Sequence, residues 1–268
     1  FSNSPRLASF DSNGFTLTSD NGGNASGGTY VGWAWDAGTT TATNTDGSIT
    51  SNVRANQSAG FSIVTYTAPA TATVTIGHGL NAAPEFILVK GRNKTYNWDV
   101  YHVDIGPTKR LMLNLSNAAE TQSGVWNNTA PTSTVFSSKS NGAWYASGDT
   151  LVAYCFAPVA GYSAFGSYTG NGSSDGPFVF TGFRPRWIMF KRSDASSSWR
   201  IHDTERETYN PHDSLLFPNE SSAEATNSVY NVDIVSNGFK VKNTNSNFNT
   251  SGGTYLYACF SEHPFKTA

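Results

Sequence analysis

The chain has 268 residues, of which 38% are hydrophobic and only 13% charged, and its formal net charge at pH 7 is -2. This length allows one large domain or two to three modules of about 100 residues each. The weak charge argues against a nucleic-acid partner. Membrane insertion is not expected either, because no apolar run approaches the roughly 18 residues of a spanning helix.

The N-terminal residues resemble the end of the chain. The sequence SFDSNGF at 9–15 followed by GGTYVGWAW at 27–35 matches DIVSNGF at 233–239 followed by GGTYLYACF at 252–260. We therefore interpret residues 1–35 as a half module, the C-terminal half of a repeat unit. The opening half lies upstream in a longer polypeptide, comes from another subunit, or is dispensable. The first residue is not Met, so we expect a processed product, a fragment or the ordered part of something longer.

A low-complexity stretch covers residues 36–59, and no counterpart occurs later in the chain. We expect a linker or an arm that is exchanged with a neighbouring subunit. Within it, residues 49–53 alternate in a way that suits an edge strand, which is how an extended arm would pair with another chain.

Two full copies of one pattern follow, over residues 60–160 and 161–268. The copies are offset by 101 residues up to position 102 and by 104 residues after it, which indicates a short loop insertion. Repeats of this kind point to tandem modules. Corresponding residues include Pro84 and Pro185, Lys90 and Lys191, Trp98 and Trp199, Leu111 and Leu215, and Cys155 and Cys259.

Each copy has the features of antiparallel β-structure. Short aromatic and β-branched runs alternate with period two and are separated by Gly, Asn, Ser and Pro. The runs are at 84–91, 149–157, 186–192 and 253–261. We predict an all-β protein of tandem antiparallel β-sandwich modules, built from an internal repeat of about 101 to 104 residues.

Three Asn-Gly pairs, Asn13-Gly14, Asn141-Gly142 and Asn237-Gly238, predict three tight hairpins at one place in the three copies. Such pairs favour hairpins because both residues tolerate a positive φ. The two cysteines, Cys155 and Cys259, are expected to be buried and unbridged, since equivalent positions in two modules lie far beyond disulfide reach.

Histidine and carboxylate side chains lie together in WDVYH (98–102) and WRIHD (199–203), a combination used in general-base catalysis. The repeat keeps the Trp and the Val or Ile but changes the polar ends, which is typical of packed strands. Asp175, Glu205 and Glu207 are candidates for a glycosidase carboxylate pair, and solvated surface is the competing interpretation. We expect no catalytic residue and no cofactor.

Metal binding is also not expected. His78, His202, His212 and His263 show no ligand spacing such as HxH or HExxH.

Three aromatic residues stand among turn residues: Tyr96, Trp126 and Tyr209. Exposed aromatic rings beside Asn and Asp suit stacking on a sugar face or contact with a protein partner. In the alternative, each ring folds back as a lid on its own sandwich. We predict these three residues as surface contacts and leave both interpretations open.

Whole phrases of the chain resemble a module that recurs in tailed-phage virion proteins, especially marine and cyanobacterial ones. The phrases span most of 47–268 and include GSITSNVRANQSAGFSIVTYT, HGLNAAPEFILVK, WNNTAPTSTVF and GPFVFTGFRPRWIMFKR. The resemblance implies an extracellular, non-enzymatic virion protein of a tail fibre, capsid fibre or similar appendage. It also implies homo-oligomers, usually trimers, contact with other virion proteins, and host attachment through surface glycans. A bacterial adhesin or filament subunit and a polysaccharide-degrading tail spike are the alternatives.

Overall fold

A computed structural model describes residues 6–19, 22–70, 72–140 and 145–261, and nearly all of its regular structure is β-strand. The chain forms two compact units, residues 1–35 and 36–268. Within the described residues, no helix has the length and apolar character needed to cross a membrane.

The first unit contains a single described hairpin, formed by β1 (Leu7–Asp11) and β2 (Gly14–Leu17). Most of its side chains are exposed. Residues 27–35, predicted to match the closing strand of a module, have no strand. A strand needs a partner for its backbone N–H and C=O groups, and among the described residues no strand pairs with this segment.

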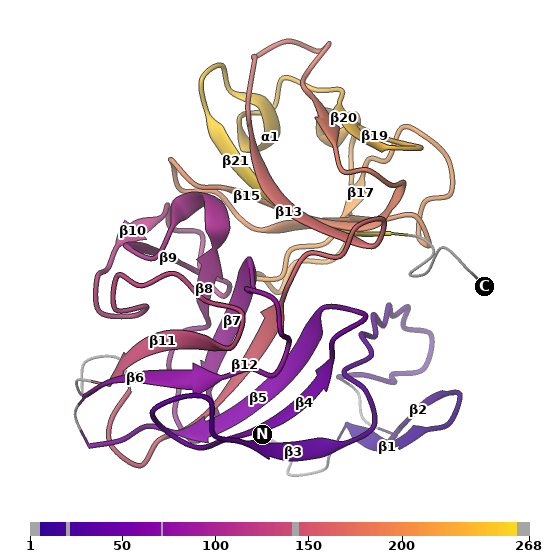
Figure 1. Ribbon diagram of the computed structural model, residues 1–268. Helices are drawn as coiled ribbons and strands as arrows, with labels where there is room; N and C mark the ends of the chain where they lie inside the picture. Colours follow the sequence, from indigo (N-terminus) through magenta and orange to yellow (C-terminus); the bar gives the residue numbers. More distant parts are fainter. Residues whose placement is uncertain (1–5, 20–21, 71, 141–144, 262–268) are drawn as a thin grey trace. The chain divides into compact units, whose positions relative to one another are not determined.

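The larger unit begins with an N-terminal sandwich (Figure 1). One sheet has eight strands in the order β10-β9-β8-β7-β12-β5-β4-β3, and β6 pairs with β11 in the facing sheet. The strands are β3 (Thr41–Asn44), β4 (Ser51–Asn56), β5 (Phe61–Thr67), β6 (Ala72–Gly77), β7 (Phe86–Gly91), β8 (Asp99–His102), β9 (Lys109–Met112), β10 (Glu120–Thr121), β11 (Val135–Ser140) and β12 (Thr150–Phe156), with the 3-10 helix η1 (Val103–Ile105) after β8.

The C-terminal sandwich completes the unit (Figure 1). A four-stranded sheet, β13-β21-β15-β16, shares a core with the three-stranded sheet β14-β20-β19, and β17 pairs with β18. The elements are β13 (Ser163–Thr169), β14 (Phe178–Phe180), β15 (Pro185–Arg192), β16 (Arg200–Asp203), β17 (Ser214–Leu215), β18 (Ala225–Thr226), η2 (Ser228–Tyr230), β19 (Val232–Val235), β20 (Gly238–Val241), α1 (Ser246–Asn249) and β21 (Thr254–Ser261).

Both sandwiches are built from period-two strands, as the residue pattern predicted. In β12, Leu151, Ala153 and Cys155 point into the core, whereas Val152 and Tyr154 point outward and are half-exposed. Inward apolar side chains from the two facing sheets form one core in each sandwich. The all-β sandwich prediction is therefore confirmed.

Strand order recurs between the sandwiches, but the residue correspondence needs two corrections. Cys155 pairs with Ser62 while Cys259 pairs with Ala164, so the first strands correspond one residue later than the ungapped comparison placed them. Further on, Leu111 pairs with Val100 and Leu216 bridges Ile201. Leu216, and not Leu215, is thus the counterpart of Leu111.

The segment 36–59, expected as a linker or exchanged arm, adds β3 and β4 to the large sheet of its own chain. Val53 of β4 pairs with Val64 of β5 and is buried in the core. An alternating apolar residue pattern on β4 explains this, because it gives the strand one face to bury.

Two of the three predicted hairpins are observed, and Asn141-Gly142 lies outside the described residues. The turn residues are Ser12-Asn13 and Ser236-Asn237, and neither Asn has a positive φ. Gly238 instead begins β20, where a Cβ atom would lie 2.0 Å from the Val179 carbonyl oxygen of β14. The hairpin prediction was right, but the reason for this glycine is close strand approach.

Candidate functional site

The three predicted surface aromatics have different environments. Tyr209 is 84% exposed in the loop after β16. Tyr96 is half-buried; its hydroxyl donates to Asp149 Oδ2 at 2.7 Å and its ring meets Tyr145 edge to face. Tyr209 alone offers a fully accessible ring, and Tyr96 folds back as a lid on its own sandwich.

Trp126 is a correction to the surface prediction, because only 2% of it is exposed. Its ring packs edge to face on Tyr101, with 5.7 Å between the ring centroids, and belongs to the N-terminal core. Turn residues surround Trp126 in the sequence, but burial of a large apolar ring outweighs that local signal. It presents no face to a partner.

The WDVYH motif forms β8, and all four residues of that strand are buried. Asp99 accepts hydrogen bonds from Arg110 at 2.8 Å and from the Tyr145 hydroxyl at 2.7 Å. Burial raises the pKa of Asp99 and lowers the pKa of His102, so the imidazole is held neutral. A carboxylate fully engaged by Arg110 and Tyr145 is a structural ion pair rather than a general base.

The candidate glycosidase carboxylates each have their own partner. Asp175 binds Lys240 at 2.8 Å, and this contact lowers its pKa. Glu205 pairs with Arg186. Glu207 accepts from the Ser214 backbone N–H at 2.8 Å, and partial burial raises its pKa. Asp175 and Glu205 are largely exposed, as solvated surface residues are.

The histidines and cysteines of the described residues form neither a metal site nor a reactive nucleophile. In the described ranges, no three His, Cys, Asp or Glu residues are grouped as metal ligands, and His263 lies outside those ranges. Burial lowers the pKa of His202 to about 3. Cys155 and Cys259 are free and fully buried, and burial raises the pKa of both thiols, so neither is a reactive nucleophile.

A cluster of hydrogen bonds joins the two sandwiches, and we call it the joint. Residues 113–119, the joint loop, follow β9. The Ser116 carbonyl oxygen in this loop accepts from the Ser197 backbone N–H at 2.8 Å, from Ser196 Oγ at 3.2 Å and from Lys191 Nζ at 3.3 Å. One carbonyl group thus holds three donors of the other sandwich.

Further contacts extend the joint. The Ala119 backbone N–H donates to the Ser193 carbonyl at 2.8 Å, and the Trp199 indole N–H donates to the Met112 carbonyl at 2.9 Å. Because these acceptors are backbone groups, the joint depends on loop shape more than on side-chain identity.

Lys191 is the charged centre of the joint. Only 1% of the residue is exposed, and Nζ also donates to the carbonyls of Arg192 at 2.7 Å and Ser197 at 2.8 Å. Burial lowers its pKa to about 8, and the neighbouring charges of Arg200 and Arg192 add to that effect. The ammonium group donates to three carbonyl oxygens, and their dipoles satisfy its charge.

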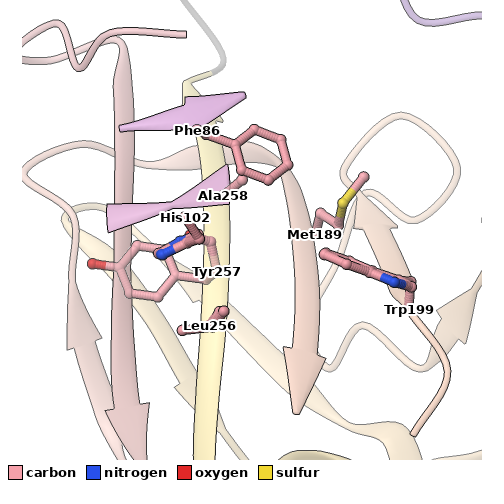
Figure 2. A pocket seen from close by; sticks show the side chains of 7 residues that line it. All are labelled: Phe86, His102, Met189, Trp199, Leu256, Tyr257 and Ala258. Atoms are coloured by element: carbon pink, nitrogen blue, oxygen red, sulfur yellow. The ribbon is translucent and has the colours of Figure 1, made fainter. Parts of the chain in front are cut away.

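Apolar side chains close the joint around a small cavity of about 10 Å³, which is room for one water at most (Figure 2). Figure 2 shows His102 close to Tyr257 and Met189 beside Trp199. His102 Nε2 lies 3.2 Å from the Tyr257 carbonyl oxygen. The cavity is too small for a substrate, so this contact is an interface and not a binding pocket.

Sequence reasoning did not identify the joint. It aligned Lys90 with Lys191 and Trp98 with Trp199, but it assigned neither pair a function. The signal was a lysine inside a strongly apolar run, PRWIMFKR, which predicts a buried ammonium group that must find acceptors.

Fold and site together define a nearly all-β protein whose two antiparallel β-sandwiches are joined by hydrogen bonds and buried side chains. The chain belongs to the family described as a domain of unknown function, DUF7483, whose model matches residues 2–264. Searches of curated proteins and of solved structures found no significant match.

Proposed function

We propose that the protein is a non-enzymatic structural component of a phage virion, part of a fibre or surface appendage that contributes to host attachment. The observation that carries this proposal is the joint, since it makes two sandwiches one compact unit without forming a pocket for chemistry. The resemblance to tailed-phage modules supplies the virion context.

In this function the chain assembles with itself, as a trimer by analogy with other fibres, and with other virion proteins. Tyr209 is the proposed contact with a host surface glycan, because its ring is exposed next to Asn210. Repeated weak contacts in an oligomer raise apparent affinity by roughly 10²-fold to 10⁴-fold, so a deep pocket is unnecessary.

Immunogold labelling of the native source material, viewed by negative-stain electron microscopy, tests the proposal. Label at tail tips or over capsids is the expected result. Antibody preabsorbed with the purified protein is the control and leaves particles unlabelled. Label on cell-borne filaments in material without particles would overturn the virion role and favour the adhesin.

A further inference from the structure

The joint covers the outer face of the large sheet in the C-terminal sandwich. The outer face of the N-terminal sandwich has the same cross-strand pairing but is not covered in this way. We call the residues Leu88, Lys90, Trp98, Val152 and Tyr154 the open face. Two pairs of neighbours on β7 and β12 correspond to two on β15 and β21. The matched register pairs are Leu88–Tyr154 with Met189–Ala258, and Lys90–Val152 with Lys191–Leu256.

Burial differs sharply between these matched positions. The five matched positions in the C-terminal sandwich are all buried; they are Met189, Lys191, Trp199, Leu256 and Ala258. Every residue of the open face is instead half-exposed. In the C-terminal sandwich the matched apolar face is buried by another part of the chain. The open face has no such contact among the described residues, and an exposed apolar face indicates an interaction site.

The polar groups of the open face are also arranged as they are in the joint. Lys90 Nζ donates to the Tyr96 carbonyl, as Lys191 Nζ does to the Ser197 carbonyl. The further acceptor that Lys191 finds in Ser116 has no counterpart at Lys90 in the described part of the chain. Lys90 therefore retains donor capacity for an incoming carbonyl group.

A counterpart of the joint loop exists in the C-terminal sandwich. Asn114 Oδ1 accepts from the Trp98 backbone N–H at 2.9 Å, and Asn219 Oδ1 accepts from the Trp199 backbone N–H at 2.8 Å. The same anchor thus holds both loops. Residues 218–224, which we call the open loop, are exposed except for Asn219, whereas Ser116 in the joint loop is half-buried.

Charge complements the two unpartnered surfaces. The open loop carries Glu220 and Glu224, which bind the Ser198 hydroxyl and Arg206 respectively and remain solvent-accessible. Two exposed cations, Arg92 and Lys94, border the open face. Opposite charges on the two surfaces favour their association.

We propose that a second copy of this chain docks its open loop on the open face, which repeats the joint between copies. The contact is head to tail, so each pair of copies still has one free loop and one free face, and assembly continues until a ring closes or a filament grows. This inference rests on the proposed structural function for its biological purpose, while the surfaces stand on the geometry alone.

Sedimentation velocity of the purified full chain over a concentration series tests the proposal. The wild type is expected to self-associate. The face variant, Leu88→Arg with Tyr154→Arg, and the loop variant, Glu220→Lys with Ser221→Arg, each lower the association constant by at least about tenfold. A mixture of the two variants forms a one-to-one dimer that grows no further, because only one intact face and one intact loop remain.

Ser133→Arg, on an exposed turn away from both surfaces, is the matched control and associates like the wild type. Circular dichroism checks that each variant is folded. A wild type that stays monomeric at all concentrations, or variants that fail to restore a dimer on mixing, would overturn the proposal. Neither result touches the immunogold outcome, so the two proposals fail separately.

Discussion

At the residue scale, the buried Lys191 makes stability depend on pH. Its pKa is about 8 in the folded chain and 10.5 in the unfolded chain, so between these values the unfolded chain binds more protons. The contribution of this group to the free energy of unfolding therefore rises with pH from about 8 to 10.5, by on the order of 3 kcal/mol. Urea unfolding at a series of pH values measures it, and Lys191→Met is expected to lack the rise.

The exposed Lys242 gives the matched control, because Lys242→Met removes a charge without changing burial. The raised pKa values of Cys155 and Tyr168 lower the free energy of unfolding at alkaline pH in the wild type and in both variants. Comparing the three pH curves removes that shared effect. Parallel curves for wild type and Lys191→Met would contradict the prediction.

Tyr209 carries the second prediction at this scale. Tyr209→Ala removes an exposed ring without opening the core, so stability is expected to stay within about 0.5 kcal/mol. Binding of labelled protein to host cells is expected to fall several-fold if the ring stacks on surface glycan. Phe180→Ala, at another exposed aromatic residue, is the control. Equal loss in both variants would show that Tyr209 has no specific contact.

At the element scale, Gly60 precedes β5 and lies against the backbone of Ala157, which follows β12. Its φ is +63°, and a Cβ atom would lie 2.3 Å from the Ala157 carbonyl oxygen. The Ala157 N–H donates to the Gly60 carbonyl oxygen, so the two backbone segments are held close together. Gly60→Ala therefore combines an unfavourable positive φ with a steric clash. We expect a loss of about 2 to 4 kcal/mol, measured by chemical denaturation.

Gly106 separates the two causes, because its φ is +70° but no atom lies within 4 Å of an added Cβ. The ψ of Gly106 is 178°, which with a positive φ is a conformation nearly confined to glycine, so Gly106→Ala is expected to cost only this conformational part, about 1 to 3 kcal/mol. Equal losses for the two substitutions would show that the strand approach at Gly60 relaxes.

At the scale of the whole molecule, the joint couples the unfolding of the two sandwiches. Calorimetry of the wild type is expected to show one transition for residues 36–268. Met189→Asp places a charge in the buried joint and is expected to split that transition into two. Leu88→Asp, at the matched half-exposed position and at a concentration that keeps the chain monomeric, should preserve one transition. Two transitions in the wild type would contradict the coupling.

Particular elements show how far the sequence alone could lead. Alternation in β12 and β7 was enough to predict sandwich strands and buried cysteines. The prediction that the Trp126 ring is exposed was wrong, because the ring packs on Tyr101 and residue patterns do not show contacts between distant segments. The expected linker failed at β4, since strand pairing with β5 is likewise a non-local interaction.

Composition, period-two patterning and the internal repeat determined by themselves that this chain is all-β, weakly charged and modular, because these properties depend on residue type and local spacing. Only the tertiary structure decided that a hydrogen bond from Lys191 to the Ser116 carbonyl oxygen helps to join the two sandwiches. A backbone carbonyl group accepts that hydrogen bond, and every residue type carries one. An interface made of carbonyl acceptors leaves little trace in the sequence until folding brings the loop to the lysine.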